Sequence, residues 1–150
     1  MPANKKPRKK YRGPRMLPGE MPTTIRHSDE SDTLLQMVPH VELDKFREGN
    51  ADAYTVNTLA FRLGWGYVMA GEYFDTPEAR KTMEDGLGAI RGVKERFGRT
   101  KKYGASQPEF QAIGVALSLT DEMQKMTTRR EQRDAVRKLR ILNDFKKANP

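Results

Sequence analysis

The sequence DAYTVNTLAFRLGWGYVMAG, residues 52–71, is the most apolar stretch of the chain, and Arg62 is the only charged residue between its Leu59 and Ala70. Apolar side chains recur in it every three or four residues, which is the spacing of one α-helical face. That first face is formed by Val56, Leu59, Ala60, Leu63 and Tyr67. A second face carries Tyr54, Phe61, Trp65 and Val68. The pattern predicts a central helix that neighbouring helices contact on several sides.

Glycines interrupt this helix and the next one in pairs. Gly64 and Gly66 lie in the stretch above, and Gly86 and Gly88 lie in the helix that follows it. A glycine inside a helix costs about 1 kcal/mol relative to alanine, so its presence needs a packing reason. We therefore expect these glycines to mark close helix crossings or a kink.

Clear helix start signals follow the central stretch. Residues 76–78, Thr-Pro-Glu, supply a hydroxyl cap, a proline in the first turn and an acid near the positive helix end. Ser106 with Glu109, and Thr128 with Glu131, have the spacing of a capping box. These signals predict helices at residues 77–97, ending at Gly98, at 106–127 and, after a break at Thr128, at 128–147. The last helix is expected to bury Ala135, Val136, Leu139 and Leu142.

A short helix is predicted at residues 39–48, before the central one. Pro39 suits a first helical turn, because no amide partner is needed there, and Gly49 supplies the stop. Its inward side chains would be Val41, Leu43 and Phe46. Strand patterns are nearly absent from the sequence. We therefore expect an all-α fold, an antiparallel four-helix bundle with this short accessory helix.

Composition divides the chain into an arm, residues 1–33, and a helical bundle domain, residues 34–150. The arm is expected to be disordered, because it holds Pro2, Pro7, Pro14, Pro18 and Pro22 and few apolar residues. Its first 15 residues carry seven basic and no acidic side chains. Residues 16–128 carry 13 basic and 17 acidic side chains, and residues 129–150 carry 8 basic and 3 acidic side chains. Attraction to a polyanion should therefore be local to the two ends and sensitive to salt.

The basic groups are the candidate contacts for nucleic acid, since blocks of like charge are often interaction tails. Four arginines of the last helix, spaced three, four and three residues apart, share a face and can pair with phosphates. An ordinary solvated face and a solubilising tail are the alternatives, and the arm would also suit nuclear import in a eukaryote. Tyr11, and Tyr103 beside Lys101, could stack on bases. The predicted nucleic-acid-binding residues are Lys5, Lys6, Arg8, Lys9, Lys10, Tyr11, Arg12, Arg15, Lys101, Lys102, Arg130, Arg133, Arg137 and Arg140.

Residues for catalysis or metal binding do not form a recognisable pattern. The chain has no cysteine, and its histidines are His27 and His40, far apart and outside any zinc-site spacing. Asp29, Glu30 and Asp32 fit a solvated linker better than a cation site. No serine lies in a nucleophile elbow, and no glycine-rich loop follows a strand. We therefore expect no enzymatic activity, no metal and no cofactor, and the lack of a long apolar segment predicts no membrane partner.

Three stretches together resemble a known group of proteins. They are KPRKKYRGPR at residues 6–15, LGWGY at 63–67 and TTRRE at 127–131. These stretches resemble small basic helical proteins carried by temperate phages and prophages of proteobacteria, and the likeness covers most of the chain. The resemblance implies a cytoplasmic setting in a bacterial host cell and a role in phage and host biology. It implies no catalytic activity and no particular site residues.

Two functions fit these features. The first is a non-enzymatic phage-type binding protein whose basic arm engages nucleic acid or a ribonucleoprotein, while the body supplies shape and register. No helix-turn-helix pattern is present, so sequence-specific reading is not predicted. The alternative is an inhibitor or adaptor that binds an acidic host protein surface, with Trp65, Phe61 or a helix face as an apolar anchor. The oligomeric state stays open, because the apolar positions of the central helix could also form a homodimer interface.

Overall fold

The computed structural model describes residues 29–148, and all the regular secondary structure in that range is helical, with no strand. The prediction of an all-α fold is confirmed. Residues 1–28 of the predicted arm and the last two residues lie outside the described part, whereas residues 29–33, which were expected to be disordered, belong to the first helix. The elements are α1 (Asp29–Glu48), α2 (Ala53–Met69), the π-helix η1 (Ala70–Phe74), α3 (Pro77–Thr100), α4 (Gln107–Met126) and α5 (Arg129–Ala148).

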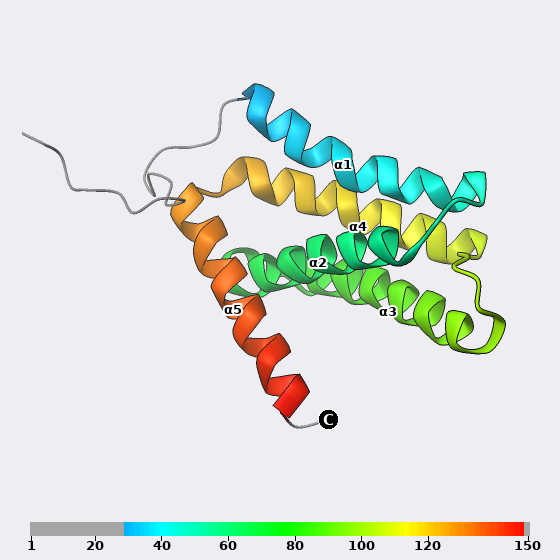
Figure 1. Ribbon diagram of the computed structural model, residues 1–150. Helices are drawn as coiled ribbons and strands as arrows, with labels where there is room; N and C mark the ends of the chain where they lie inside the picture. The colour runs from blue at the N-terminus through cyan, green and yellow to red at the C-terminus, as the bar shows by residue number, and fades with distance from the viewer. Residues whose placement is uncertain (1–28, 149–150) are drawn as a thin grey trace, which may run out of the picture.

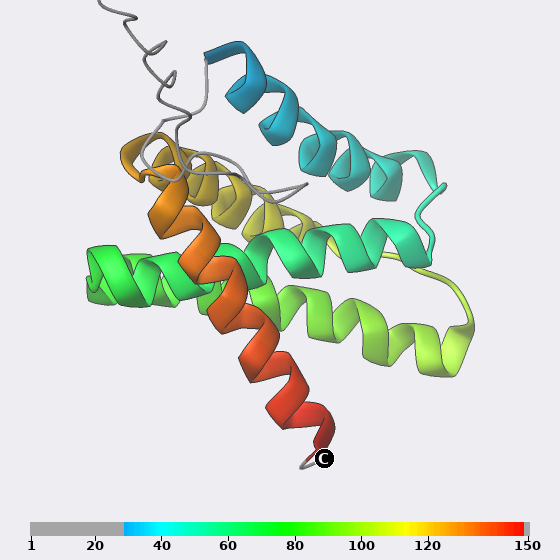
Figure 2. The ribbon, with the colours of Figure 1, turned by 60° about the vertical axis from the view of Figure 1, so that its left-hand side comes forward.

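Helix α2 lies at the centre of the arrangement, as the sequence predicts. It packs against α1, α3, α4 and α5, whereas α5 packs chiefly against α2. Helix α1 also contacts α4, and α3 packs against α4 (Figure 1). Helix α5 crosses α2 at a steep angle, and its C-terminal half continues past the other helices (Figure 2).

The buried side of α2 combines residues of both predicted apolar faces, and Tyr67 of the first face is 37% exposed. Val56, Leu59 and Leu63 are at most 2% exposed, and Trp65 is 6% exposed. They pack with buried side chains from the other helices, among them Met83, Ile90, Val93, Ile113 and Leu117. Burying such side chains contributes about 1.5–3 kcal/mol each. The second predicted face is not uniformly covered, because Tyr54 and Phe61 remain 60% and 49% exposed.

Three of the four paired glycines lie at close helix crossings. A Cβ atom on Gly86 would lie 2.5 Å from the Cβ of Ala116 in α4, and one on Gly66 would lie 2.7 Å from the Cε of Met83 in α3. At Gly64 the nearest atom would be the Cδ1 of Leu139 in α5, at 3.1 Å. Alanine therefore cannot replace Gly66 or Gly86 without a shift of the neighbouring helix. The same prediction is wrong for Gly88, around which nothing lies within 4 Å.

The helix starts agree with the capping signals. Thr76 accepts a hydrogen bond from the backbone of Ala79, and Ser106 forms a capping box with Glu109. The predicted break at Thr128 is confirmed, because α4 ends at Met126 and α5 begins at Arg129. The oxygen of Thr128 accepts from the backbone N–H of Glu131.

Two helix ends differ from their predictions. Helix α3 does not stop at Gly98 but runs to Thr100, where Lys101 takes the left-handed conformation with φ of 58° and donates its N–H to the carbonyl of Phe97. The predicted short helix at 39–48 is instead the second half of the 20-residue α1, with Pro39 inside it. Proline removes one helical hydrogen bond, but packing against α2 and α4 stabilises α1 through that point.

The prediction of burial is wrong for two residues. Val41 is 53% exposed and Leu142 is 41% exposed, although Leu43 and Leu139 on the same helices are buried. In both cases the helix contacts its neighbours along one narrow side only, so apolar residues beyond that side reach solvent.

Candidate nucleic-acid interface

Helix α5 has a buried face and an arginine face. Gln132, Ala135 and Leu139 are buried against the body. On the opposite side Arg130, Arg137 and Arg140 are exposed, and Arg133 is half-buried. The predicted spacing therefore places Arg130, Arg137 and Arg140 away from the body, whereas the Nε atom of Arg133 is buried. We call Arg130, Arg133, Arg137 and Arg140 the arginine face.

The exposed members of the arginine face lack acidic partners in the described part of the chain. Within residues 29–148, Arg130, Arg137 and Arg140 form no ion pair. Two arginines elsewhere behave differently, since Arg62 pairs with Asp121 and Arg96 with Glu109. An unpaired guanidinium keeps all five of its donors available for an external phosphate or carboxylate.

Hydrogen bonds from α2 and η1 fix the start of α5. The indole Nε1 of Trp65 donates to the carbonyl of Gln132 at 3.1 Å, and the hydroxyl of Tyr73 donates to the carbonyl of Glu131 at 3.2 Å. Trp65 is therefore buried and uses its polar atom inside the protein. Its predicted role as an exposed apolar anchor for a partner is wrong, whereas Phe61 does remain exposed.

The buried amide of Gln132 ties α5 to the end of α4. Its Nε2 donates to the carbonyls of Gln124 and Thr127, at 3.1 and 3.3 Å, and lies 3.2 Å from the hydroxyl of Thr127. Buried polar groups must be paired in this way, because an unpaired one costs about 1–3 kcal/mol. These bonds set the angle at which α5 leaves the body, and so the direction of the arginine face.

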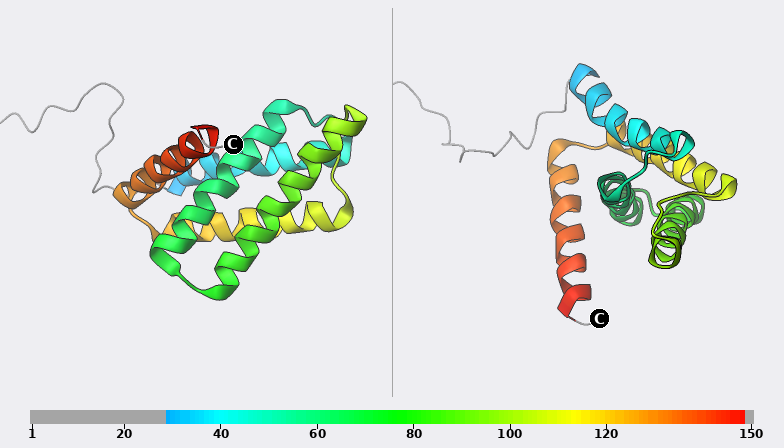
Figure 3. Two further views of the ribbon diagram at one scale, coloured as in Figure 1. Left: turned by 90° about the horizontal axis from the view of Figure 1, so that it is seen from below. Right: turned by 45° about the vertical axis from the view of Figure 1, so that its right-hand side comes forward.

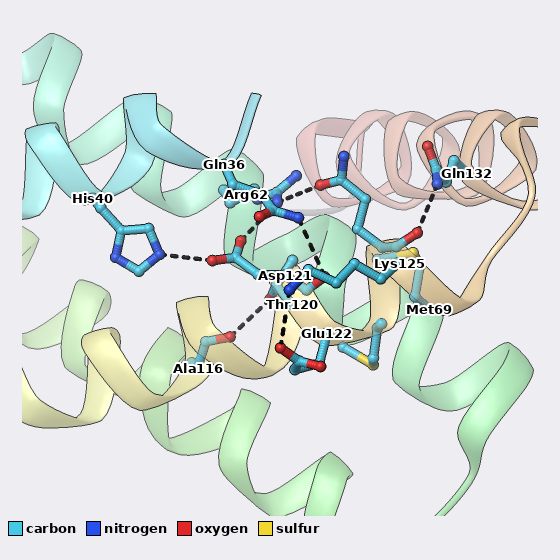
Figure 4. A network of polar contacts seen from close by, with 12 residues as sticks. Gln36, His40, Arg62, Met69, Ala116, Thr120, Asp121, Glu122, Lys125 and Gln132 are labelled. Atoms are coloured by element: carbon cyan, nitrogen blue, oxygen red, sulfur yellow. Dashed lines mark hydrogen bonds and ion pairs between the residues drawn. The ribbon is translucent and has the colours of Figure 1, made fainter. Parts of the chain in front are cut away.

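A polar network connects α1, α2 and α4 beneath this joint (Figure 4). The Nη2 of Arg62 donates to the Oδ1 of Asp121 at 2.9 Å and also to the side chain of Gln124. The Nε2 of His40 lies 2.7 Å from the other carboxylate oxygen of Asp121. The guanidinium of Arg62 also lies over the ring of Trp65, with 4.8 Å between its Cζ and the ring centroid. The network therefore includes Trp65, whose indole donates to α5, and Gln124, whose carbonyl accepts from the amide of Gln132.

Sequence reasoning missed this network. His40 and Asp121 are 81 residues apart, and Arg62 and Asp121 are 59 residues apart, so no local spacing relates them. The one available signal was Arg62 itself, a lone charge in the most apolar stretch, which needs a buried partner. Each oxygen of the carboxylate is used by another helix, and this arrangement is typical of a structural clamp.

The predicted loop contacts do not join the arginine face. Lys101 and Lys102 are exposed, but they lie between α3 and α4, at the end of the molecule away from α5 (Figures 1 and 3). Tyr103 stacks on Phe97 with ring centroids 3.9 Å apart and planes 5° apart. Phe97 therefore covers one face of this half-buried ring, and the suggested stacking of Tyr103 on a base stays a prediction.

The arm candidates lie outside the described residues. They are Lys5, Lys6, Arg8, Lys9, Lys10, Tyr11, Arg12 and Arg15. In the range 29–148, no group of three or more histidine, cysteine, aspartate or glutamate residues could hold a metal ion. None of the helices described combines the length and the apolar character needed to cross a membrane.

Comparisons with known proteins return nothing: no protein-family model, curated protein or solved structure matches this chain.

Proposed function

We propose that this chain is a non-enzymatic binding protein that engages nucleic acid or a ribonucleoprotein through its basic arm and the arginine face of α5. The observation that carries the proposal is the exposure of Arg130, Arg137 and Arg140 without an acidic partner among residues 29–148. The sequence adds seven cations at residues 1–15, without one acid.

The arginine face suits a polyanion in its dimensions and chemistry. Arg130 and Arg140 are ten positions apart, which is about 15 Å along a helix. Several phosphates of a duplex lie within such a length, and each arginine that neutralises one releases condensed counterions. Such contacts fix position without reading sequence, so we expect binding to be largely nonspecific.

The body would serve as a scaffold for these charges. In this interpretation α1 to α4 form the four-helix bundle, and α5 is the accessory helix that carries the binding surface, whereas the sequence pattern assigns the accessory role to residues 39–48. The proposed setting is the cytoplasm of a bacterial host, in the biology of a temperate phage. The setting rests on the resemblance of residues 6–15, 63–67 and 127–131 to the phage group.

An adaptor that binds an acidic host protein is the second candidate. Phe61 favours it, because this large aromatic side chain is 49% exposed on the central helix. Exposed aromatic residues are enriched among the anchors of protein interfaces. Nuclease treatment separates the two candidates, since only the nucleic-acid complex should be lost on digestion.

The test is a salt titration of binding to generic duplex DNA, single-stranded DNA and RNA. The intact chain should bind at low salt with a steep negative slope of log affinity against log salt. Removing residues 1–15 should make the slope of log affinity against log salt much less steep, because that variant loses seven cations. No binding of any of the three nucleic acids at low salt would reject the proposal.

A further inference from the structure

The last turns of α5 expose three large apolar side chains. Ile141, Leu142 and Phe145 are 68%, 41% and 66% exposed. Their spacing of one and three residues places them on one side of the helix, in the part that continues past α2 (Figures 2 and 3). Single apolar side chains on a surface are common, but a contiguous cluster marks a binding surface. We call these three residues the apolar end of α5.

The apolar end adjoins a groove with a volume of about 170 Å³. The groove lies between α5 and the junction of α2 with η1, and its apolar lining comes from Tyr67, Val68 and Leu142. Leu142 belongs to both features, so the apolar surface is continuous from the helix into the groove. Pockets for small ligands measure about 300–1,000 Å³, so this groove suits a side chain of a partner better than a cofactor.

The surroundings of the apolar end are strongly basic. Residues 137–148 contain five basic side chains and one acid, Asp144. Lys138 is already paired with Glu72 at the groove, whereas Arg137 and Arg140 form no ion pair within the described range. A second copy docked through the same face would bring these cations together, which costs several kcal/mol when like charges meet in an interface. A partner with carboxylates would instead complement them.

The apolar end also differs from the surface proposed for nucleic acid. At about 100° per residue, Phe145 lies about 140° around α5 from Arg140, whereas Ile141 lies only about 40° from Arg137. Phosphates gain little from isoleucine or phenylalanine, whereas these side chains are typical contacts for an amphipathic helix. One helix therefore carries an arginine face and an apolar end that meet at Arg137 and Arg140.

We propose that the apolar end of α5 and the adjoining groove bind an acidic amphipathic helix of a partner protein. Apolar side chains of that helix pack on Ile141 and Phe145, and one of them enters the groove beside Leu142. Its aspartate and glutamate residues pair with Arg137 and Arg140 at the border of the apolar end. The inference goes beyond the nucleic-acid function and does not rest on it, because its apolar contacts are made by Ile141, Leu142 and Phe145, although Arg137 and Arg140 border both surfaces.

The test uses the full chain and two labelled synthetic peptides of 18 residues. Both carry leucine along one helical face; the remaining positions are mostly glutamate in the first peptide and mostly lysine in the second. Fluorescence anisotropy should show binding of the glutamate peptide and at least tenfold weaker binding of the lysine peptide. The double variant Ile141→Ser, Phe145→Ser should bind the glutamate peptide at least tenfold more weakly than the parent. Val115→Ser is the control, since Val115 is 60% exposed on α4.

Both substituted residues are exposed, so the double variant should keep the helical circular dichroism and the melting temperature of the parent. Its affinity for duplex DNA should also be unchanged, which separates this inference from the nucleic-acid function. Equal affinity of parent and double variant for the glutamate peptide would overturn the proposal, as would equal binding of the two peptides. Three other results would also overturn the proposal, because each would assign the surface to another occupant. They are self-association of the chain, binding to anionic phosphatidylglycerol vesicles, and binding to DNA, in each case present in the parent and lost in the double variant.

Discussion

The arginines of the body and those of α5 are used in opposite ways. Arg62 is 8% exposed, and its guanidinium pairs with Asp121 and Gln124 from a different helix. Arg130 and Arg140 reach solvent, and within residues 29–148 they form no ion pair. A charge buried in the body must be matched inside the protein, whereas one on the surface costs little and can be matched by a partner. The difference indicates which charges maintain the fold and which are available for binding.

The largest effect on stability is expected from breaking the buried pair. Asp121→Ala removes the carboxylate that holds Arg62 and His40, and it leaves the guanidinium buried without its countercharge. We expect a loss of about 3 kcal/mol in the free energy of unfolding, measured by urea denaturation. Asp144→Ala removes an exposed acid from α5 and should cost less than about 0.5 kcal/mol. Similar losses for the two variants would contradict the contrast between body and α5.

A smaller loss is expected at the joint between the two regions. Gln132→Ala removes the amide that donates to the carbonyls of Gln124 and Thr127. Two buried acceptors lose a partner, so unfolding should become easier by about 1–2 kcal/mol. Gln111→Ala is the matched control, because Gln111 is exposed on α4. If both variants melt at the parent temperature, the amide does not hold α5 in place.

The pH dependence of stability should reflect the second paired arginine of the body. Hydrogen bonds from Arg96 hold the pKa of Glu109 below its ordinary value of 4.5. The unfolded chain therefore binds a proton at Glu109 before the folded chain does, and this contribution to stability is lost as pH falls from about 4.5 through the lowered pKa. Urea denaturation between pH 6 and pH 3 measures the loss, which should be smaller in Glu109→Gln. An identical pH profile for parent and variant would show that the pair does not stabilise the fold.

Local signals predicted the helix boundaries well where the cap lies within four residues of its partner. The break at Thr128 and the start at Ser106 depend on side chains three residues away, so spacing alone was sufficient. The beginning of α1 was missed because packing on α2 and α4 overrides the effect of Pro39, and packing cannot be read from local sequence.

The candidate site was predicted in part for the same reason. Helical repeat alone places Arg130 and Arg137 on the outer face of α5. The contact of Arg62 and His40 with Asp121 depends on how three helices meet, and nothing in the spacing of these residues indicates it. Trp65 shows the converse error, since an aromatic residue that looked available for a partner is consumed by a hydrogen bond to α5.

Substitutions on the arginine face should have the smallest effect on the free energy of unfolding and a large effect on binding to duplex DNA. The triple variant Arg130→Gln, Arg137→Gln, Arg140→Gln should unfold within about 0.5 kcal/mol of the parent, because these side chains are exposed. The control is Arg91→Gln, Lys94→Gln, Arg99→Gln, which removes the same charge from exposed positions on α3.

The most direct measurement compares these two triple variants by salt titration of duplex binding and urea denaturation on the same samples. We expect the slope of log affinity against log salt to fall by about 3 for the α5 variant and by much less for the control, with both chains equally stable. Equal slopes for the two variants, or a clear loss of stability in the α5 variant alone, would contradict the assignment of α5 to binding.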